Sequence, residues 1–366
     1  MRLKELSLTN FKNIPSVRLE LSGKVNCFLG NNGMGKSNLL DAVYFLSFCK
    51  SFTGVTDRMA ITRGEDFAML RGVYERNGSE EELLMGLSTA RRKSLKRSGK
   101  EYQRLSEHIG LFPLVMAAPQ DVDLIRDSGE ERRRWMDMVI AQSDAVYLDA
   151  LIRYGKGLEQ RNRLLREGCV DASLYGAVEA MMEMSAEVIC DARRRWVEAL
   201  TGLIERHYAA IAGDAEAVGL TYESHLNTPG ATLTALLDSA RRHDEAVRHT
   251  SVGPHRDDIV MTLSGMPLRR TGSQGQWKTF TTALRFAQYD FLRRATGMRP
   301  LLLLDDIFDK LDARRVERIM EIVTSGDDFG QIFITDTNRK HLDEIMSRTG
   351  SDFSMWSVDN GTFTLQ

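Results

Sequence analysis

Hydrophobic and polar positions alternate at the start of the chain and later change to helical spacing. Residues 3–8 and 17–21 alternate as paired strands do, and residues 25–29 form an apolar run that predicts a buried strand. From about residue 121 to residue 248 the apolar positions recur with helical spacing. Members of these stripes are Leu148, Leu151, Ile152, Leu158, Met181, Met182, Val188 and Ile189. Strand patterns return at about residue 250, followed by a helix and the apolar run at 301–304.

This order predicts one α/β unit that is interrupted by a helical insertion. We expect residues 1–117 and 250–366 to form the α/β lobe, and residues 118–249 to form the inserted, mainly helical lobe. The helical stripes do not keep a strict heptad for long, which disfavours a long coiled coil.

Composition limits the classes of function. The 366 residues include 49 Lys and Arg against 51 Asp and Glu, so nucleic-acid binding would need a local basic patch. No apolar run approaches the roughly 18 residues of a membrane span, and the first residues lack an apolar signal core. The cysteine and histidine spacings fit no zinc site. We therefore expect a cytoplasmic protein with no membrane contact.

A glycine-rich loop follows the strand expected at residues 25–29. Residues 30–37 read GNNGMGKS and fit G-x-x-x-x-G-K-[ST], with an apolar helix pattern after them. In such a loop the backbone N–H groups surround phosphates, the lysine reaches the β- and γ-phosphates, and the serine hydroxyl ligates Mg²⁺. The sequence therefore predicts an ATP and Mg²⁺ site, whose nucleotide-binding residues are Gly30, Asn31, Asn32, Gly33, Met34, Gly35, Lys36, Ser37 and Asn38.

Two carboxylates follow the second apolar run. Four leucines at 301–304 predict a strand buried in a parallel sheet, and Asp305 and Asp306 stand at its C-terminal end. Ligands of α/β sheets bind at that edge, beside the glycine-rich loop. We expect Asp305 to be a Mg²⁺ ligand and Asp306 to polarise the attacking water.

A third segment, GSQGQ at residues 272–276, precedes another apolar helix. Free amides and small residues at a helix start can bind an anion. By itself the segment is weak evidence for a nucleotide site, but it lies shortly before the strand that ends at Asp305. Ser273, Gly275 and Gln276 are therefore further candidates for nucleotide contact.

This order of motifs resembles the ABC-type ATPase heads, including the SMC and Rad50-like DNA-repair ATPases. The resemblance implies an α/β fold: an ABC-type P-loop ATPase head, here with an inserted helical lobe and no long coiled coil. It also implies an ATP-dependent homodimer, in which the S-x-G-Q loop of one subunit covers the ATP of the other.

Four segments carry a closer resemblance, to the RecF family: LSLTNFKN at 6–13, GKSNLLD at 35–41, GPHRDD at 253–258 and LDDIFDKLD at 304–312. The family implies roles for single residues. Lys36 and Asp306 are catalytic, with Asp306 where most ABC ATPases have Glu; Ser37, Asp305 and the Q-loop residue Gln120 are metal-site residues; Asp312 belongs to the D-loop and contacts nucleotide. Lys12 stands where relatives often have Arg and is a candidate nucleotide contact.

The same resemblance implies a function. Members of the family dimerise with ATP on double-stranded and gapped DNA, without sequence preference, at gaps or stalled forks. Slow, DNA-stimulated ATP hydrolysis then releases the DNA, in recombinational repair and recombinase loading with RecR- and RecO-like mediators.

A basic segment at residues 91–104 is the first candidate for DNA contact. Its members Arg91, Arg92, Lys93, Lys96 and Arg97 would neutralise phosphates if they lay together on one hairpin. A solvated hairpin fits the pattern equally well. The arginine triplets at 132–134 and 193–195 are alternatives, and surface or interlobe ion pairing explains them too. The sequence leaves the role of His255 and Arg256 open.

Two other functions fit the ATPase motifs. A transporter's nucleotide-binding subunit is disfavoured because the switch histidine is missing from residues 333–337. An ATPase coupled to a nuclease would need a further carboxylate-rich metal site, and the acidic pairs at 305–306 and 257–258 are the only clusters of that kind that we find in the sequence.

Overall fold

The computed structural model describes residues 1–213, 216–309, 311–324, 328–349 and 352–366. The chain divides into two compact units: Met1–Asp121 with Ala210–Ala212 and Lys278–Gln366, and Val122–Ala209 with Gly213–Trp277. Residues 250–277 thus group with the helical unit, although we expected them in the α/β lobe. The reason is strand pairing, because β10 (Asp258–Leu263) is antiparallel to β9 (Val218–Glu223) along its whole length.

The first unit contains an antiparallel sheet with the strand order β2-β1-β4-β5-β6-β7. Its strands are β1 (Arg2–Phe11), β2 (Ile14–Glu20), β4 (Phe67–Arg76), β5 (Ser79–Ser88), β6 (Ser94–Arg97) and β7 (Lys100–Glu101). Buried and exposed residues alternate along β5, so one face of the sheet packs on the core and the other faces solvent.

The second sheet of this unit has the order β15-β14-β3-β13-β12-β8. Its strands are β3 (Val25–Leu29), β8 (Leu114–Ala117), β12 (Leu301–Asp305), β13 (Ile332–Asp336), β14 (Phe353–Asp359) and β15 (Thr362–Leu365). All neighbouring pairs except β14 and β15 are parallel. Strands β12 and β13 are buried at every residue, because helices cover a parallel sheet on both faces.

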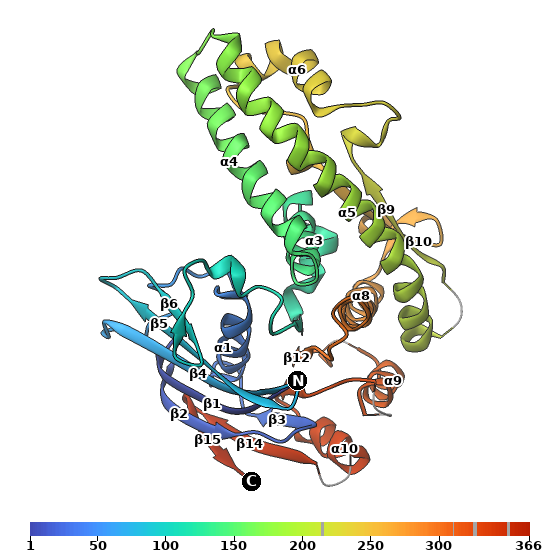
Figure 1. Cartoon of the computed structure of the whole chain (residues 1–366). Helices are drawn as coiled ribbons and strands as arrows, with labels where there is room; N and C mark the ends of the chain where they lie inside the picture. Colours follow the sequence, from blue (N-terminus) through green and yellow to red (C-terminus); the bar gives the residue numbers. More distant parts are fainter. Residues whose placement is uncertain (214–215, 310, 325–327, 350–351) are drawn as a thin grey trace. The chain divides into compact units, whose positions relative to one another are not determined.

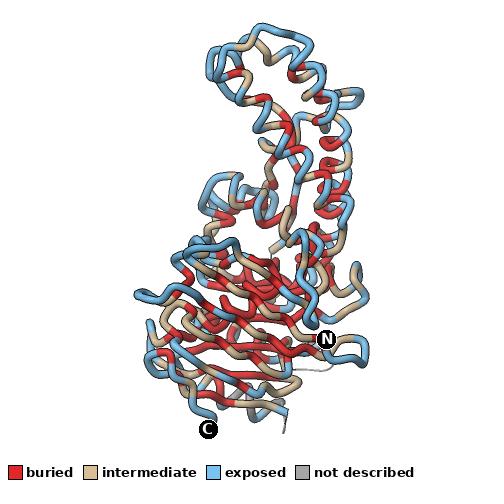
Figure 2. Tube along the Cα trace, turned by 60° about the vertical axis from the view of Figure 1, so that its left-hand side comes forward, coloured by how far each residue is buried: buried red, intermediate tan, exposed pale blue. Residues whose placement is uncertain are grey.

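Helix α1 (Lys36–Phe48) lies between the two sheets of this unit and contacts strands of both (Figure 1). It is buried almost along its whole length, which explains why its sequence is apolar on all sides (Figure 2). The later helices are α8 (Gln274–Thr296), α9 (Ala313–Thr324) and α10 (Arg339–Thr349). Helix α10 contacts β3 and β13.

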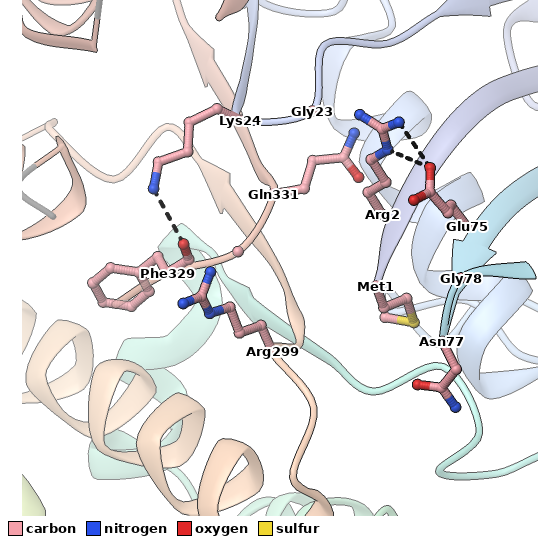
Figure 3. Close-up of a pocket in the computed structure, with 11 residues that line it drawn as sticks. Met1, Arg2, Gly23, Lys24, Glu75, Asn77, Gly78, Arg299, Phe329 and Gln331 are labelled. Carbon is pink, nitrogen blue, oxygen red and sulfur yellow. Dashed lines mark hydrogen bonds and ion pairs between the residues drawn. The ribbon is translucent and has the colours of Figure 1, made fainter. Parts of the chain in front are cut away.

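A buried amide fixes the start of β13. The side chain of Gln331 accepts a hydrogen bond from Leu3 N at 2.7 Å and donates to the carbonyls of Leu3 and Ser22 at 2.8 and 2.7 Å. These bonds join the start of β13 to β1 and to the segment between β2 and β3. Figure 3 shows the position of Gln331.

The second unit is mainly helical. Its helices are α2 (Asp123–Arg126), α3 (Gly129–Ala141), α4 (Ala145–Glu167), α5 (Ala172–Ala212), α6 (Leu233–Val247) and α7 (Leu268–Thr271); β11 (Met266–Pro267) completes the small sheet with β9 and β10. Helices α4 and α5 form an antiparallel hairpin, and a Cβ at Gly157 would lie 2.6 Å from the side chain of Met182. No helix among the described residues is long and apolar enough to cross a membrane.

Candidate functional site

The glycine-rich loop connects the end of β3 to the start of α1, as the sequence predicts. Gly33 and Gly35 have φ values of 81° and 113°, which L side chains rarely adopt. The Lys36 ammonium donates to the carbonyls of Gly30 and Asn31 at 2.6 and 2.9 Å, so the loop curls around this charge. Burial lowers the pKa of Lys36, and the carboxylates of Asp306, Asp305 and Asp336 oppose this shift.

Neighbouring segments hold the loop in place. The Asn13 side chain donates to the Gly33 carbonyl at 3.3 Å and accepts from Asn38 at 2.8 Å. The β14–β15 turn also reaches the loop, since Gly361 N donates to the Met34 carbonyl at 2.8 Å. A Cβ at Gly361 would lie 2.2 Å from the Asn13 carbonyl oxygen, so this position requires glycine.

Asp305 is the last residue of β12 and meets the loop at the carboxyl ends of the parallel strands. Its Oδ1 atom accepts from the Ser37 hydroxyl at 2.9 Å and from the Thr335 hydroxyl at 2.6 Å. Burial raises its pKa, while these two hydrogen bonds and Lys36 act in the opposite direction. A serine hydroxyl beside one carboxylate is the oxygen donor set that fits Mg²⁺, which keeps several waters and phosphate oxygens as its other ligands.

Asp306 adopts a left-handed backbone conformation, with φ 47°. Its N–H donates to Thr335, to the carbonyl at 3.2 Å and to the hydroxyl at 3.1 Å. Burial and the nearby Asp336, Asp305 and Asp309 carboxylates raise its pKa, and Lys278 opposes them. A half-exposed carboxylate with a raised pKa beside the loop is suited to accept a proton from water.

Thr335 and Asp336 are site residues that we did not predict. Asp336 ends β13, and its carboxylate accepts from His341 Nδ1 at 2.8 Å and from Asn338 N at 2.8 Å. Its carbonyl accepts from Gly30 N at 3.4 Å. The signal was present in the sequence, because residues 332–336 are another apolar run that ends in Thr-Asp.

Of three further predicted residues of the first unit, Lys12 and Asp312 have internal roles as well. The Lys12 ammonium forms an ion pair with the buried Asp41 carboxylate at 2.7 Å, so a contact with nucleotide would compete with this pair. Gln120 is exposed, and the next residue, Asp121, forms a buried ion pair with Arg285. Asp312 accepts from Arg315 N at 3.0 Å and so caps the start of α9.

The predicted signature residues form a capping box at the start of α8. The Ser273 hydroxyl accepts from Gln276 N at 3.3 Å, and the Gln276 side chain accepts from Ser273 N at 2.8 Å. Gly275 lies within this first turn. The next residue, Trp277, donates a hydrogen bond from its indole to the Leu268 carbonyl at 3.0 Å, so this side chain contacts its own unit.

Residues 91–93 of the basic segment lie in the connection between β5 and β6, and residues 94–101 form the β6–β7 hairpin. The cations of the segment differ in availability. Lys93 donates to the Cys49 carbonyl at 2.7 Å and pairs with Asp57 at 3.0 Å. Arg97 pairs with Glu81 at 2.6 Å. Arg91, Arg92 and Lys96 are exposed, and no hydrogen bond or ion pair joins their side chains to the described part of the chain. Of the five candidate residues, these three are presented for an external anion; Lys100 and Arg104 of the same segment are exposed as well.

The arginine triplets are mostly used inside the helical unit. Arg132 holds Asp258 with two hydrogen bonds of 2.6 and 2.8 Å, and Arg193 pairs with Asp137 and Asp257, both at 2.8 Å. Arg134 pairs with Glu130 within α3. Ion pairing, the alternative explanation of these triplets, therefore accounts for their buried members, although the pairs lie within one unit and not between lobes.

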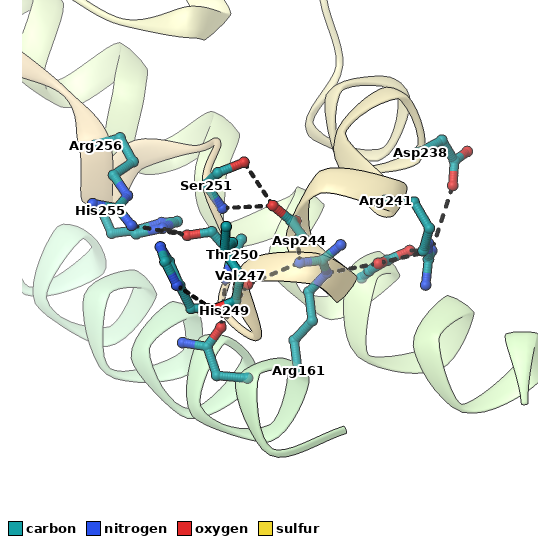
Figure 4. Close-up of polar contacts among 12 residues, drawn as sticks. Arg161, Asp238, Arg241, Asp244, Val247, His249, Thr250, Ser251, His255 and Arg256 are labelled. Atoms are coloured by element: carbon teal, nitrogen blue, oxygen red, sulfur yellow. Dashed lines mark hydrogen bonds and ion pairs between the residues drawn. The ribbon is translucent and has the colours of Figure 1, made fainter. Parts of the chain in front are cut away.

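His255 and Arg256 take part in a second polar network of this unit, in which Arg256 itself is exposed (Figure 4). His255 contacts the Tyr154 hydroxyl at 2.8 Å and the Thr250 carbonyl at 3.0 Å, and burial lowers its pKa to about 4. Arg256 donates to the same carbonyl at 3.3 Å. Below them, the buried Arg161 joins α4 to Glu179 and Asp244 at 2.8 and 2.7 Å. Residues of the GPHRDD motif thus connect several elements of this unit through hydrogen bonds and ion pairs.

Comparison with known proteins finds relatives of almost the whole chain. The family model for the RecF/RecN/SMC N terminal domain matches residues 2–355. The DNA replication and repair protein RecF of Bacteroides fragilis is 49% identical over 363 residues, which cover 99% of this chain and 97% of that protein. RecF of Porphyromonas gingivalis is 46% identical, with 99% of both chains covered.

A solved structure agrees as well. The recombination mediator protein RecF with ATP, from the RecFOR pathway, superposes with a TM-score of 0.89 at 27% identity, and the match covers 100% of this chain and 99% of that one.

Proposed function

Because this chain belongs to the RecF family, we propose that it is an ATP-dependent DNA-binding protein of recombinational repair. The observation that carries the proposal is the meeting of Lys36, Ser37 and Asp305 at one sheet edge, with Ser37 bonded to Asp305 at 2.9 Å. There the loop N–H groups and Lys36 would hold the phosphates of ATP. Ser37 and Asp305 would hold Mg²⁺, with Gln120 as a further candidate, and this cation would neutralise charge on the phosphates.

ATP hydrolysis in this proposal is slow and acts as a timer. Asp306 accepts the proton of the attacking water, and its left-handed backbone fixes where the carboxylate points. An aspartate is one methylene shorter than the glutamate of most ABC ATPases, so it reaches the water less well. DNA stimulates the reaction, and hydrolysis releases the protein from DNA.

Dimerisation follows from the signature segment. Ser273 and Gly275 begin a helix of 23 residues, whose N-terminus favours an anion. We infer that this segment in one copy closes on the γ-phosphate held by the other, and that Asp312 lies at the same interface. A two-fold arrangement satisfies both copies at once. ATP therefore holds the two copies together, and ADP, which lacks the γ-phosphate, does not.

The ATP cycle controls DNA binding in this proposal. Arg91 and Arg92, in the β5–β6 connection, and Lys96, on β6, are exposed and would contact phosphates without reading bases. Double-stranded and gapped DNA are therefore the expected ligands, with RecR- and RecO-like mediators as partners in recombinase loading. Action on chromosomal DNA places the protein in the cytoplasm.

The two other functions receive less support. Relatives and a solved structure that match almost the whole chain are RecF proteins, which disfavours a transporter subunit. No group of three or more metal-binding side chains occurs among the residues that the structure describes, which gives a coupled nuclease no second metal site.

The test is DNA affinity measured with ATP, with ADP and without nucleotide, each in Mg²⁺ and at two salt concentrations. We expect tight, salt-sensitive binding of gapped duplex DNA with ATP only. Equal affinity under all three nucleotide conditions would contradict ATP-dependent DNA binding, and cleavage of the DNA would favour the nuclease.

A further inference from the structure

The side chain of Lys278 contacts the segment that carries Asp306. Lys278 begins the second turn of α8, and its ammonium donates to the Asp309 carbonyl at 2.5 Å and to the Asp306 carbonyl at 3.5 Å. The shorter contact is a strong bond from a charged donor, and the longer one lies at the outer limit of a hydrogen bond. All three residues belong to the first unit. One lysine therefore connects α8 to both ends of the segment 306–309.

The middle of this segment is fixed by packing. Ile307 and Phe308 are each only 3% exposed. The Phe308 ring also meets the His341 ring edge-on, with centroids 5.4 Å apart. The apolar side chains therefore hold the centre of the segment, and Lys278 holds its ends.

Asp306 needs such support because its backbone is left-handed, with φ 47°. A residue other than glycine keeps this conformation only when its surroundings enforce it. The Asp306 N–H donates to Thr335, and the Asp306 carbonyl faces Lys278. The peptide groups on both sides of the Asp306 Cα are thus held, which sets the direction of its carboxylate.

Lys278 also places a positive charge near the Asp306 carboxylate. Burial and three neighbouring carboxylates raise the pKa of Asp306, and Lys278 opposes this shift. The three carboxylates are those of Asp336, Asp305 and Asp309. Lys36 is a second cation close to these acids. Because Lys36 bonds to carbonyls of the glycine-rich loop, the carbonyls after β12 are left to Lys278.

The same helix start carries the signature residues. Ser273 and Gln276 cap the first turn of α8 through two hydrogen bonds. At ~1.5 Å rise per residue, Ser273 and Lys278 are separated by roughly 7 Å along the helix axis. A capped helical turn is stiff, so a displacement of Ser273 also displaces Lys278.

We propose that Lys278 is a positioning residue that links docking of the signature segment to the placement of Asp306. When Ser273 of one chain docks on the partner's ATP, Lys278 of that chain holds its own Asp306 in the direction needed for hydrolysis. Lys278 acts through Asp306 and accepts no proton itself. This inference rests on the ATPase and the dimer proposed above, and it adds a connection between assembly and hydrolysis.

Single-turnover hydrolysis of γ-labelled ATP by Lys278→Met tests the inference. Its rate should fall by roughly 10-fold or more, since a charged hydrogen bond is lost. Half-saturation by ATP and the ATP-dependent dimer in sedimentation should stay as in the wild type. Lys278→Arg keeps the charge and the donors, and it should recover most of the rate. Arg294→Met removes an exposed cation from the same helix and is the matched control, which should hydrolyse ATP like the wild type.

A double-mutant cycle separates positioning from a general structural role. If Lys278 acts through Asp306, then Lys278→Met should cause no further loss in an Asp306→Asn background. An equal fold-loss in both backgrounds would overturn the inference. Equal rates in Lys278→Met and in an active wild type would also overturn it, while the proposed function would stand. A wild type that hydrolyses no ATP would contradict the proposed function, and this inference with it.

Discussion

The hydroxyl of Thr335 donates a 2.6 Å hydrogen bond to the Oδ1 atom of Asp305, on the neighbouring strand. The same atom accepts from Ser37, so Thr335 fixes the orientation of the carboxylate that would bind Mg²⁺. The Thr335 hydroxyl also accepts a hydrogen bond from the backbone N–H of Asp306. One threonine therefore positions both acids of the proposed ATPase.

Replacing Thr335 with the isosteric valine should raise the Mg²⁺ concentration that ATP hydrolysis requires. Loss of such a supporting hydrogen bond costs roughly 10- to 100-fold in metal affinity. Titration of ATPase activity with Mg²⁺ measures the change, and Thr335→Ser is the control because it retains the hydroxyl. A valine variant with an unaltered Mg²⁺ requirement would show that Asp305 needs no such support.

Asp306→Asn should bind ATP normally and hydrolyse it more slowly by about 10²- to 10⁴-fold, the usual contribution of a general base. Asparagine also tolerates the left-handed backbone, so the fold should not change. The pKa of Asp306 is raised, and its ionised form is the active one. The kcat/KM of the wild type should therefore rise with pH as Asp306 ionises, and the rise should occur at a higher pH than the usual pKa of aspartate. Above that pH, kcat/KM should level off.

The pH profile separates this account from others. An acid limb that is identical in Asp306→Asn and in the wild type would assign the proton transfer to a different residue.

Substitutions at Ser273 should separate helix capping from dimerisation. Both Thr and Asp can cap α8 in place of Ser, so both variants should stay folded. Ser273→Asp puts a negative charge where the partner's γ-phosphate would dock, and it should remain monomeric with ATP. Ser273→Thr should still dimerise. Sedimentation with ATP and with ADP checks both, and an ATP-dependent dimer of Ser273→Asp would refute this interface.

Removing Arg91, Arg92 and Lys96 together should weaken DNA binding without affecting ATP binding. If all three contact duplex phosphates, the slope of log affinity against log salt should become shallower by about 3. Lys93→Gln is the control, since Lys93 already pairs with Asp57. It should leave the slope unchanged. A slope that does not respond to the triple change would place the DNA site on another surface.

The extent of sequence prediction differs between the two units. The loop at Gly30 to Ser37 and the acids after residues 301–304 were predictable, because each motif is contiguous and its chemistry is local. Thr335 and Asp336 were not predicted, because their place beside the loop depends on β13 lying between β3 and β12. Strand order of this kind is set by the whole fold.

Burial in the helical unit was harder to predict. The expected stripe on α4 included Ile152, which is exposed, whereas Tyr147, Tyr154 and Arg161 form the buried face. An arginine can be buried there only because Glu179 and Asp244, on other helices, pair with it. Likewise, the acids that pair with Lys93 and Arg97 lie elsewhere in the sequence, so their engagement could not be seen from the basic segment.

The central claim is that Lys36 and its loop hold ATP, and calorimetric titration with ATP and Mg²⁺ tests it most directly. The wild type and Lys4→Ala, an exposed lysine paired with Glu80, should bind one ATP per chain with equal affinity. Lys36→Ala should bind at least roughly 10-fold more weakly, since a charged hydrogen bond contributes about 1.5–3 kcal/mol. Equal ATP affinity in Lys36→Ala and the wild type would contradict the account.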